Sequence, residues 1–377
     1  MSKEKSELQL AAERIASLVS LTNGKINELG YHAYCLNNVL TIIQNQFDKI
    51  RNVSSDTKRK YEQAKAIRLE WKQQVDKIES DYNSAVKVNL SKGAVGTGLG
   101  VGVVALGPTA AMSVATTYGV ASTGTAIATL HGAAATNAAL AWLGGGTLAT
   151  GGGGMASGSA LLALAGPVGW SMAGVAIISS GLMLWKAKSD KKRLEKIFMN
   201  VSKRDEKKYE LAIVELNERI KRIVDETCKL NNSIVEIGSF GFDYEAMTEQ
   251  QQFTLGAYVN LMFASSQLLV NPIMGLQPNY TEKDLSAFYY SYESSDVKSR
   301  LDFCFKYNQS KNLMVYFANF LYNISTEEKD RKLLAKSFKN NDEFLQKMRI
   351  QKNNIDLELL NCVNEALLYK NNRTASL

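Results

Sequence analysis

Two stretches of the chain carry mostly apolar residues at alternating intervals of three and four positions, and in the second stretch Glu, Lys and Arg fill the positions between them. The first stretch comprises Ile26, Leu29, Ala33, Leu36, Leu40, Ile43, Phe47 and Ile50. The second comprises Ile213, Leu216, Ile220, Ile223, Thr227, Leu230, Ile234 and Ile237. This spacing is that of a heptad seam, which places one apolar stripe along each helix. The pattern predicts an all-α protein with coiled-coil arms in residues 1–92 and residues 186–240.

The first arm continues beyond its strongest periodicity. Apolar residues resume after Ile50 at Tyr61, Ala64, Trp71, Val75, Ile78, Tyr82 and Ala85, and no proline occurs before Pro108. A helix from about residue 31 to residue 90 would be roughly 90 Å long at 1.5 Å per residue. Asn23-Gly24 is a turn signal, and it predicts that a shorter first helix ends near residue 22.

Between the two arms, residues 93–185 contain no Asp, Glu, Lys or Arg. This window also holds 21 of the 27 glycines of the chain. Surface segments of soluble folds usually collect charged residues, whereas hydrocarbon excludes them. We therefore predict a membrane-inserting region at the tip of a hairpin, with the two arms as antiparallel partners on either side of it.

The window contains two candidate membrane spans. Ala160–Trp185 is long enough to cross a bilayer core of about 30 Å, and the weaker span runs from Gly93 to about Tyr118. Small residues let helices approach closely in lipid, and the predicted contact positions are Gly96, Gly98, Gly100, Gly102, Gly166, Gly169 and Gly174. The predicted interfacial anchors are Lys92, Trp185, Lys186 and Lys188. Lysines at both ends place these ends on one side, which requires two or four crossings.

The middle of the window, residues 121–159, is almost entirely Gly, Ala, Thr and Ser. Gly, Ser and Thr favour hydrocarbon little, so this part inserts only marginally. Its glycine runs also cost helix stability, about 1 kcal/mol per glycine relative to alanine. That composition favours a conditional membrane state with self-association. Two alternatives remain open: a permanent hairpin anchor and an apolar hairpin buried inside a soluble protein.

The charge of the chain is uneven. The net formal charge is +7; residues 1–92 and residues 186–240 carry +4 each, whereas residues 241–377 carry −1. Basic arms beside an apolar window fit contact with anionic lipid head groups. No motif accompanies them that would indicate nucleic acid.

The cysteine spacing and the amino-terminal residues indicate where the chain is made. Four widely spaced cysteines have no framework spacing, which indicates free thiols. The charged amino-terminal residues indicate synthesis in the cytoplasm without an ordinary signal peptide, followed by membrane association when active.

Residues 241–377 are rich in aromatic residues and predict a compact helical domain of four to six helices. Thr281 followed by Asp284 resembles a helix capping box. We assign this domain to sensing a trigger or binding a partner, such as a regulatory or immunity protein.

Motifs for catalysis and cofactor binding are missing. The pattern GxxxxGK[ST] does not occur, and neither do the strict GxGxxG fingerprint, GxSxG and metal-ligand spacing. We therefore predict no enzyme activity, no catalytic residues, no cofactor and no metal. His32 lies beside the first seam, where packing is the simpler role. His131, inside the window, is a candidate pH switch, although a half-exposed loop histidine is the simpler interpretation.

Two heptad arms that bracket a hydrophobic, glycine-rich head resemble the α-helical pore-forming toxins, the class of haemolysin E and the Bacillus enterotoxins. The resemblance is architectural and covers roughly residues 10–237. It implies a bacterial toxin whose soluble monomers release the head, insert it and assemble into a homo-oligomer. The alternatives are a membrane-anchored coiled-coil scaffold or adaptor and a fully soluble helical protein.

Overall fold

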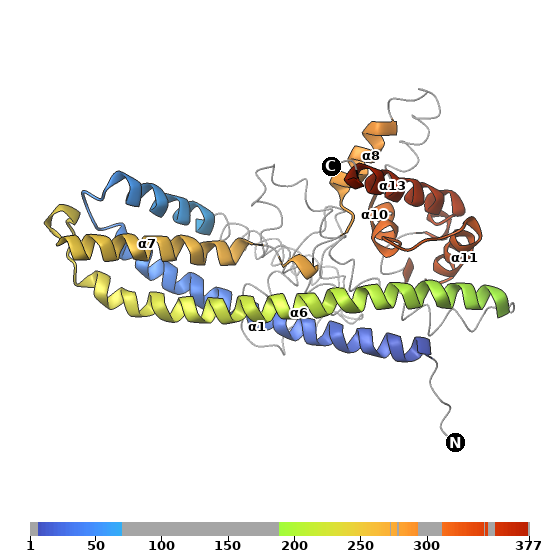
Figure 1. Cartoon of the computed structure of the whole chain (residues 1–377), viewed down its shortest axis with the longest axis horizontal. Helices are drawn as coiled ribbons and strands as arrows, with labels where there is room; N and C mark the ends of the chain where they lie inside the picture. The colour runs from blue at the N-terminus through green and yellow to red at the C-terminus, as the bar shows by residue number, and fades with distance from the viewer. Residues whose placement is uncertain are drawn as a thin grey trace, which may run out of the picture.

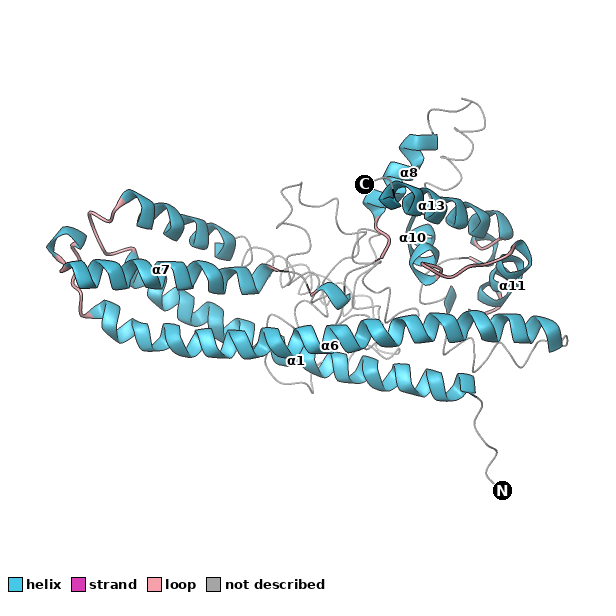
Figure 2. Ribbon diagram, in the orientation of Figure 1, coloured by secondary structure: helices cyan, strands magenta, loops and turns pink. Residues whose placement is uncertain are grey.

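The computed structural model describes residues 7–69, 188–271, 273–276, 279–292, 311–342, 344–345 and 351–375. Within these ranges the regular elements are all helices, as Figure 2 shows. The all-α prediction is confirmed. Two long helices run side by side along the molecule, with a helical bundle at one end and a smaller helical domain at the other (Figure 1).

The first long helix, α1 (Glu7–Phe47), is continuous through Asn23 and Gly24. The predicted break near residue 22 is therefore wrong. A Cβ atom added at Gly24 would meet nothing within 4 Å, so no close contact with a neighbour requires a glycine at this position. The helix continues through it. The apolar seam extends over nearly the whole of α1, and its buried members include Leu8, Ala12, Ile15, Leu29, Leu36, Leu40, Ile43 and Phe47.

The chain turns back after α1, and residues 55–69 form a second, antiparallel helix against its end. The Tyr61 ring stacks on Phe47 with 5.0 Å between centroids, and its hydroxyl donates to the carbonyl of Gln44 at 3.2 Å. The prediction of one helix from about residue 31 to 90 is wrong, since α1 ends at Phe47. Asn52, in the connection after α1, has a φ of 57°, which is a left-handed conformation. Folding back buries Tyr61 in the same core as Phe47.

The second long helix, α6 (Lys188–Gly238), packs along α1 in the same direction. Arg14 contacts Glu206 at 2.9 Å, Gln46 donates to the carbonyl of Ile234 at 3.1 Å, and Arg51 forms a parallel bridge with Asp243. The sequence separation stays near 190 along the whole interface, and that constancy defines parallel helices. The antiparallel pairing predicted from the two seams is therefore wrong. A seam specifies which face is buried, and either direction satisfies it.

Parallel packing separates the two ends of the intervening chain. Leu69 lies beside the part of α1 near Leu40, because Arg68 donates to the Leu40 carbonyl. Lys188 lies beyond the amino-terminal end of α1, because residue 206 is level with residue 14. At 1.5 Å per residue, these positions are roughly 60 Å apart along the helix axis. The described arms thus do not form the two legs of a hairpin that ends at the uncharged window.

After α6 the chain turns through η3 (Tyr244–Ala246) into α7 (Glu249–Val270) and η4 (Met274–Leu276). A capping box between Thr248 and Gln251 starts α7, which runs antiparallel to α6. Ser265 donates to Glu226, and Arg219 donates to the carbonyl of Leu268. Together α1, the helix of residues 55–69, α6 and α7 enclose one apolar core, and we call this unit the bundle.

The remaining elements form the carboxyl-terminal domain. These are α8 (Glu282–Tyr292), α10 (Lys311–Phe320), α11 (Glu328–Lys339), η5 (Lys352–Asn354) and α13 (Leu357–Ala375). Its core contains many aromatic rings, and Phe317 and Phe338 meet edge to face at 4.9 Å. The capping box at Thr281 and Asp284 is present. The amino-terminal part of α6 completes this core with Leu194, Ile197, Phe198 and Val201.

Candidate functional site: a buried charge cluster on α6

The structure brings the predicted seam residues of the two arms together. Leu36, Leu40, Ile43 and Phe47 of α1 lie in one core with Leu216, Ile220 and Ile223 of α6. Ile213 is only half-buried, and its neighbour Ala212 takes the fully buried position. The buried position is shifted from residue 213 to residue 212 because Ala212 faces η4. The backbone of Gly275 comes so close to it that a Cβ added on Gly275 would lie 2.5 Å from the Ala212 nitrogen.

Most residues predicted to meet the membrane lie outside the described ranges. They are Gly96, Gly98, Gly100, Gly102, Gly166, Gly169, Gly174, Lys92, Trp185, Lys186 and His131. Of the predicted anchors, Lys188 is described; it is the exposed first residue of α6. His32 is half-buried, and its ring meets Tyr31 edge to face at 5.2 Å.

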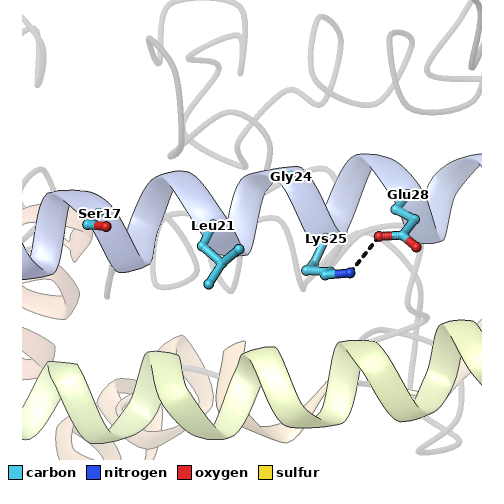
Figure 3. Close-up of a pocket in the computed structure, with 5 residues that line it drawn as sticks. All are labelled: Ser17, Leu21, Gly24, Lys25 and Glu28. Atoms are coloured by element: carbon cyan, nitrogen blue, oxygen red, sulfur yellow. Dashed lines mark hydrogen bonds and ion pairs between the residues drawn. The ribbon is translucent and has the colours of Figure 1, made fainter.

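A shallow hollow lies along the outer side of α1 (Figure 3). Its lining among the described residues consists of Ser17, Leu21, Gly24, Lys25 and Glu28. Lys25 and Glu28 form an ion pair at 2.8 Å, so their opposite charges already neutralise each other. The hollow is open to solvent and gives no convergent set of polar groups that would select a ligand.

A cluster of charged groups is buried where α6 passes the carboxyl-terminal domain. Asp205 occupies a seam position between Val201 and Tyr209, and its side chain is 1% exposed. Burial raises the pKa of this carboxyl, although Arg204 and Lys208 act in the opposite direction. One carboxylate oxygen, Oδ1, accepts from Arg204 Nε at 2.9 Å; the other accepts no hydrogen bond from the described residues. Burying a carboxylate in this way is costly, because a charge loses its hydration.

Arg204 joins this carboxylate to the end of α10. Its Nη1 atom donates to the carbonyls of Asn319, Phe320 and Tyr322 at 3.2, 3.1 and 2.6 Å. The last carbonyls of a helix lack partners within that helix, and a cation there also meets the negative end of the helix dipole. Arg204 therefore stabilises the end of α10 and compensates the charge of Asp205 at the same time.

Lys208 extends the cluster one turn further along α6. Its ammonium contacts Asn279 Oδ1 at 3.3 Å, and burial lowers its pKa to about 8 despite the attraction of Asp205. Lys370 of α13 donates to the Asn279 carbonyl at 2.6 Å and to Asp284 at 2.8 Å. Hydrogen bonds thus connect α6, residue 279, α8 and α13 into one network.

A second contact region joins the beginning of α6 to α11. Arg193 bonds Asp330 at 2.7 Å and also pairs with Glu327, while Lys329 lies 3.4 Å from Asp190. Burial alone would raise the pKa of Asp330, but the hydrogen bonds from Arg193 and the Glu327 backbone, together with the charges of Arg193 and Lys196, hold that pKa below its usual value. The first 21 residues of α6 are therefore attached to the carboxyl-terminal domain by charged groups as well as apolar ones.

The sequence contained one signal for this cluster. The run Arg204-Asp205 places a carboxylate at the three-and-four spacing that otherwise carries apolar residues in α6. A charged residue at a seam position is rare unless it is paired, so it marks a place where a polar partner is needed. The partner carbonyls come from residues more than a hundred positions away and could not be identified from the sequence.

The cluster is a closed junction rather than an open reaction centre. Its charged groups bond to backbone carbonyls, to amide side chains and to one another. The cluster therefore holds the carboxyl-terminal domain on α6. Among the described residues, no group of three or more His, Cys, Asp or Glu side chains could hold a metal ion.

One helical segment among the described residues is apolar and long enough to cross a membrane. It spans Glu249–Leu276, which includes α7, and its most apolar 18-residue window has a mean hydropathy of 1.3. In the structure 44% of its apolar window is buried. A core helix of a soluble protein can reach the same hydropathy, so this property alone gives weak support for a membrane role.

Searches of family models, curated proteins and solved structures found no match to this chain. The proposal for its function therefore rests on the described fold and on the charge distribution along the chain.

Proposed function

We propose that this chain is a helical membrane-permeabilising protein whose uncharged window, residues 93–185, enters a lipid bilayer and self-associates there. The observation that carries the proposal is the length of the window: 93 consecutive residues without a charge, between two strongly charged arms. Charged residues are excluded from hydrocarbon, and a soluble surface would be expected to contain some.

The described residues form the helical frame that the proposal requires. The seams of α1 and α6 are buried against each other and against α7, and the carboxyl-terminal domain has its own aromatic core. This arrangement suits a helical frame that carries a segment with another function.

Lys188, at the start of α6, supports the same proposal. It lies three residues after the end of the window and is exposed, as an interfacial lysine must be to reach lipid head groups. Under this proposal the carboxyl-terminal domain binds a trigger or a regulatory partner, because its junction with α6 is made of charged groups that a ligand or a change of pH can affect.

The test is the release of a dye from anionic liposomes by the purified full-length chain at pH 7 and pH 5. Gly98→Leu combined with Gly102→Leu should abolish release, since leucine prevents close helix approach in lipid. Under the proposal circular dichroism should remain unchanged, because the substitutions alter the window and leave the sequences of α1, α6 and α7 as they are. The pair Gly98→Ala and Gly102→Ala is the matched control and should retain most of the release.

A chain that lacks residues 93–185 separates the alternatives. Release by the full chain but not by the deletion variant would establish permeabilisation through the window. Flotation with lipid without any release would favour the anchored scaffold. A full chain that neither floats nor releases dye at either pH would contradict the proposal.

A further inference from the structure

The outer face of α7 lacks charge after its first turn. Glu249, in the first turn, is the single charged residue of the helix, and the uncharged run continues to Thr281. One face is buried in the bundle through Leu255, Val259 and Met262. A helix at the surface of a soluble protein usually carries charged residues on its solvent side.

Two other helices lack the combination of exposed and uncharged side chains that α7 has. Residues 313–321, in α10 and directly after it, are also uncharged, and all of them are buried. The outer side of α6 in the bundle is exposed, and it carries Glu218, Lys221 and Asp225. In α7 the same degree of exposure is combined with uncharged side chains.

After the first turn, the exposed positions of α7 follow the helical repeat and therefore form one stripe. They are Phe253, Ala257, Asn260 and Ala264; in the first turn Glu249 and Gln250 are exposed, and Glu249 lies one turn before Phe253. Phe253 is 78% exposed, and Leu261 and Phe263 are half-buried beside the stripe. An exposed phenylalanine on an uncharged stripe offers a surface for contact with another apolar phase.

A basic helix lies beside this stripe. Residues 55–69 contain five basic and two acidic residues, and Lys58, Arg59 and Lys60 are exposed. Lys60 reaches α7 directly, because its Nζ donates to Asn260 Oδ1 at 3.0 Å. Figure 1 shows this helix and α7 as neighbours at the same end of the molecule. Apolar and basic residues on one surface are the combination by which helices bind anionic lipid interfaces.

We infer that α7 and the helix of residues 55–69 form a lipid-contact face that binds an anionic membrane surface. Phe253 enters the region between head groups and acyl chains, while Lys58 and Lys60 contact the anionic head groups. This face holds the bundle at the membrane without insertion of the window. The inference rests on the proposed function only in naming the same target, a lipid surface.

The test is flotation of the full-length chain with phosphatidylcholine vesicles that contain about 30% phosphatidylserine, compared with vesicles of phosphatidylcholine alone. Phe253→Glu should weaken binding about tenfold or more, because the aromatic ring that enters the lipid in the bound state is replaced by a negative charge that faces anionic lipid. Lys58→Gln with Lys60→Gln should weaken binding to the anionic vesicles roughly tenfold. The matched controls are Val235→Glu and the pair Lys203→Gln with Lys207→Gln, all exposed positions on α6. These controls should change binding less than about twofold.

Flotation and dye release together distinguish the two proposals. If wild-type protein binds, the α7-face variants bind weakly and no protein releases dye, the lipid-contact face is supported and permeabilisation fails. If Gly98→Leu with Gly102→Leu binds normally but does not release dye, both proposals are supported. Equal binding by Phe253→Glu, the Lys58 and Lys60 double variant and wild type would overturn the inference. So would the absence of wild-type binding to anionic vesicles.

Discussion

The two halves of α6 have the same helical spacing but differ in what that spacing buries. From Tyr209 to Ile237 the buried side chains are nearly all apolar and pack in the bundle. From Leu194 to Lys208 the helix buries aliphatic and aromatic residues together with Arg204 and Asp205. The first contact depends on shape and apolar area, whereas the second also depends on compensated charge. A charged junction can respond to pH or to a ligand, which an apolar seam does not do.

The largest expected effect is at the charged junction. Arg204→Met should lower the free energy of unfolding by about 3–5 kcal/mol, because it leaves the Asp205 carboxylate buried without its cation. It also removes a donor from three carbonyls at the end of α10. Urea unfolding monitored by circular dichroism measures the change.

The control for this prediction is Arg222→Met, on the same helix, where the side chain is 61% exposed and pairs with Glu226 at 3.6 Å. It should cost less than about 1 kcal/mol. Adding Asp205→Leu to Arg204→Met should recover part of the loss. A single Arg204 variant as stable as the Arg222 variant would show that the junction does not depend on charge.

In the apolar half, Leu216→Ala should cost about 2–5 kcal/mol, because it opens a cavity in a fully buried seam. Leu216→Met keeps the volume and should cost less than about 1.5 kcal/mol. Leu211→Ala, at a site 50% exposed, is the matched control. If Leu216→Ala and Leu211→Ala have the same unfolding midpoint, Leu216 does not lie in a closed core.

Two glycines should respond to the same substitution with opposite signs. Gly275→Ala should cost about 1–3 kcal/mol, since its Cβ would lie 2.5 and 2.6 Å from the Ala212 backbone. Gly24→Ala should stabilise the protein by up to about 1 kcal/mol, because alanine is a better helix former and meets no neighbour. Thermal unfolding of both variants checks the pair, and a stabilising Gly275→Ala would contradict the close contact of η4 with α6.

The next expected effect is a difference in pH dependence rather than in stability at a single pH. The pKa of Lys208 is about 8 when folded, below its ordinary value of 10.5, so between these pH values the unfolded chain binds more protons at this group. The unfolding free energy of wild type should therefore rise from pH 7.5 to pH 10 relative to that of Lys208→Met, by roughly 2 kcal/mol. Lys203→Met, at an exposed site, should show no such slope. A constant difference between wild type and Lys208→Met would contradict a buried, charged Lys208.

The raised pKa of Asp205 has a separate acid-side consequence. Its folded-state value lies above the ordinary value, so the folded protein binds the proton more tightly there. The stabilisation from this group is present below the unfolded pKa and is lost as pH rises through the folded one. Asp330 has the opposite sign, because Arg193 lowers its pKa, and its contribution is lost as pH falls.

Local periodicity identified most of what the bundle buries. Leu36, Leu40, Ile43 and Phe47 were predicted from spacing alone, and all four lie in the core. The same spacing misassigned Ile213, because the close approach of Gly275 selects Ala212 as the buried residue. The charge cluster at Asp205 was not predicted, since its partners at Asn319 and Tyr322 are brought near only by folding.

The sequence by itself determined the helical class, the two buried seams and the uncharged window, because each depends on local spacing or composition. Only the tertiary structure decided that α1 and α6 run parallel and that residues 55–69 fold back on α1. The physical reason is that a heptad stripe specifies a face but not a direction, and a seam can stay in register across a turn. Direction is set by contacts between distant residues, such as those of Arg14 with Glu206 and Tyr61 with Phe47.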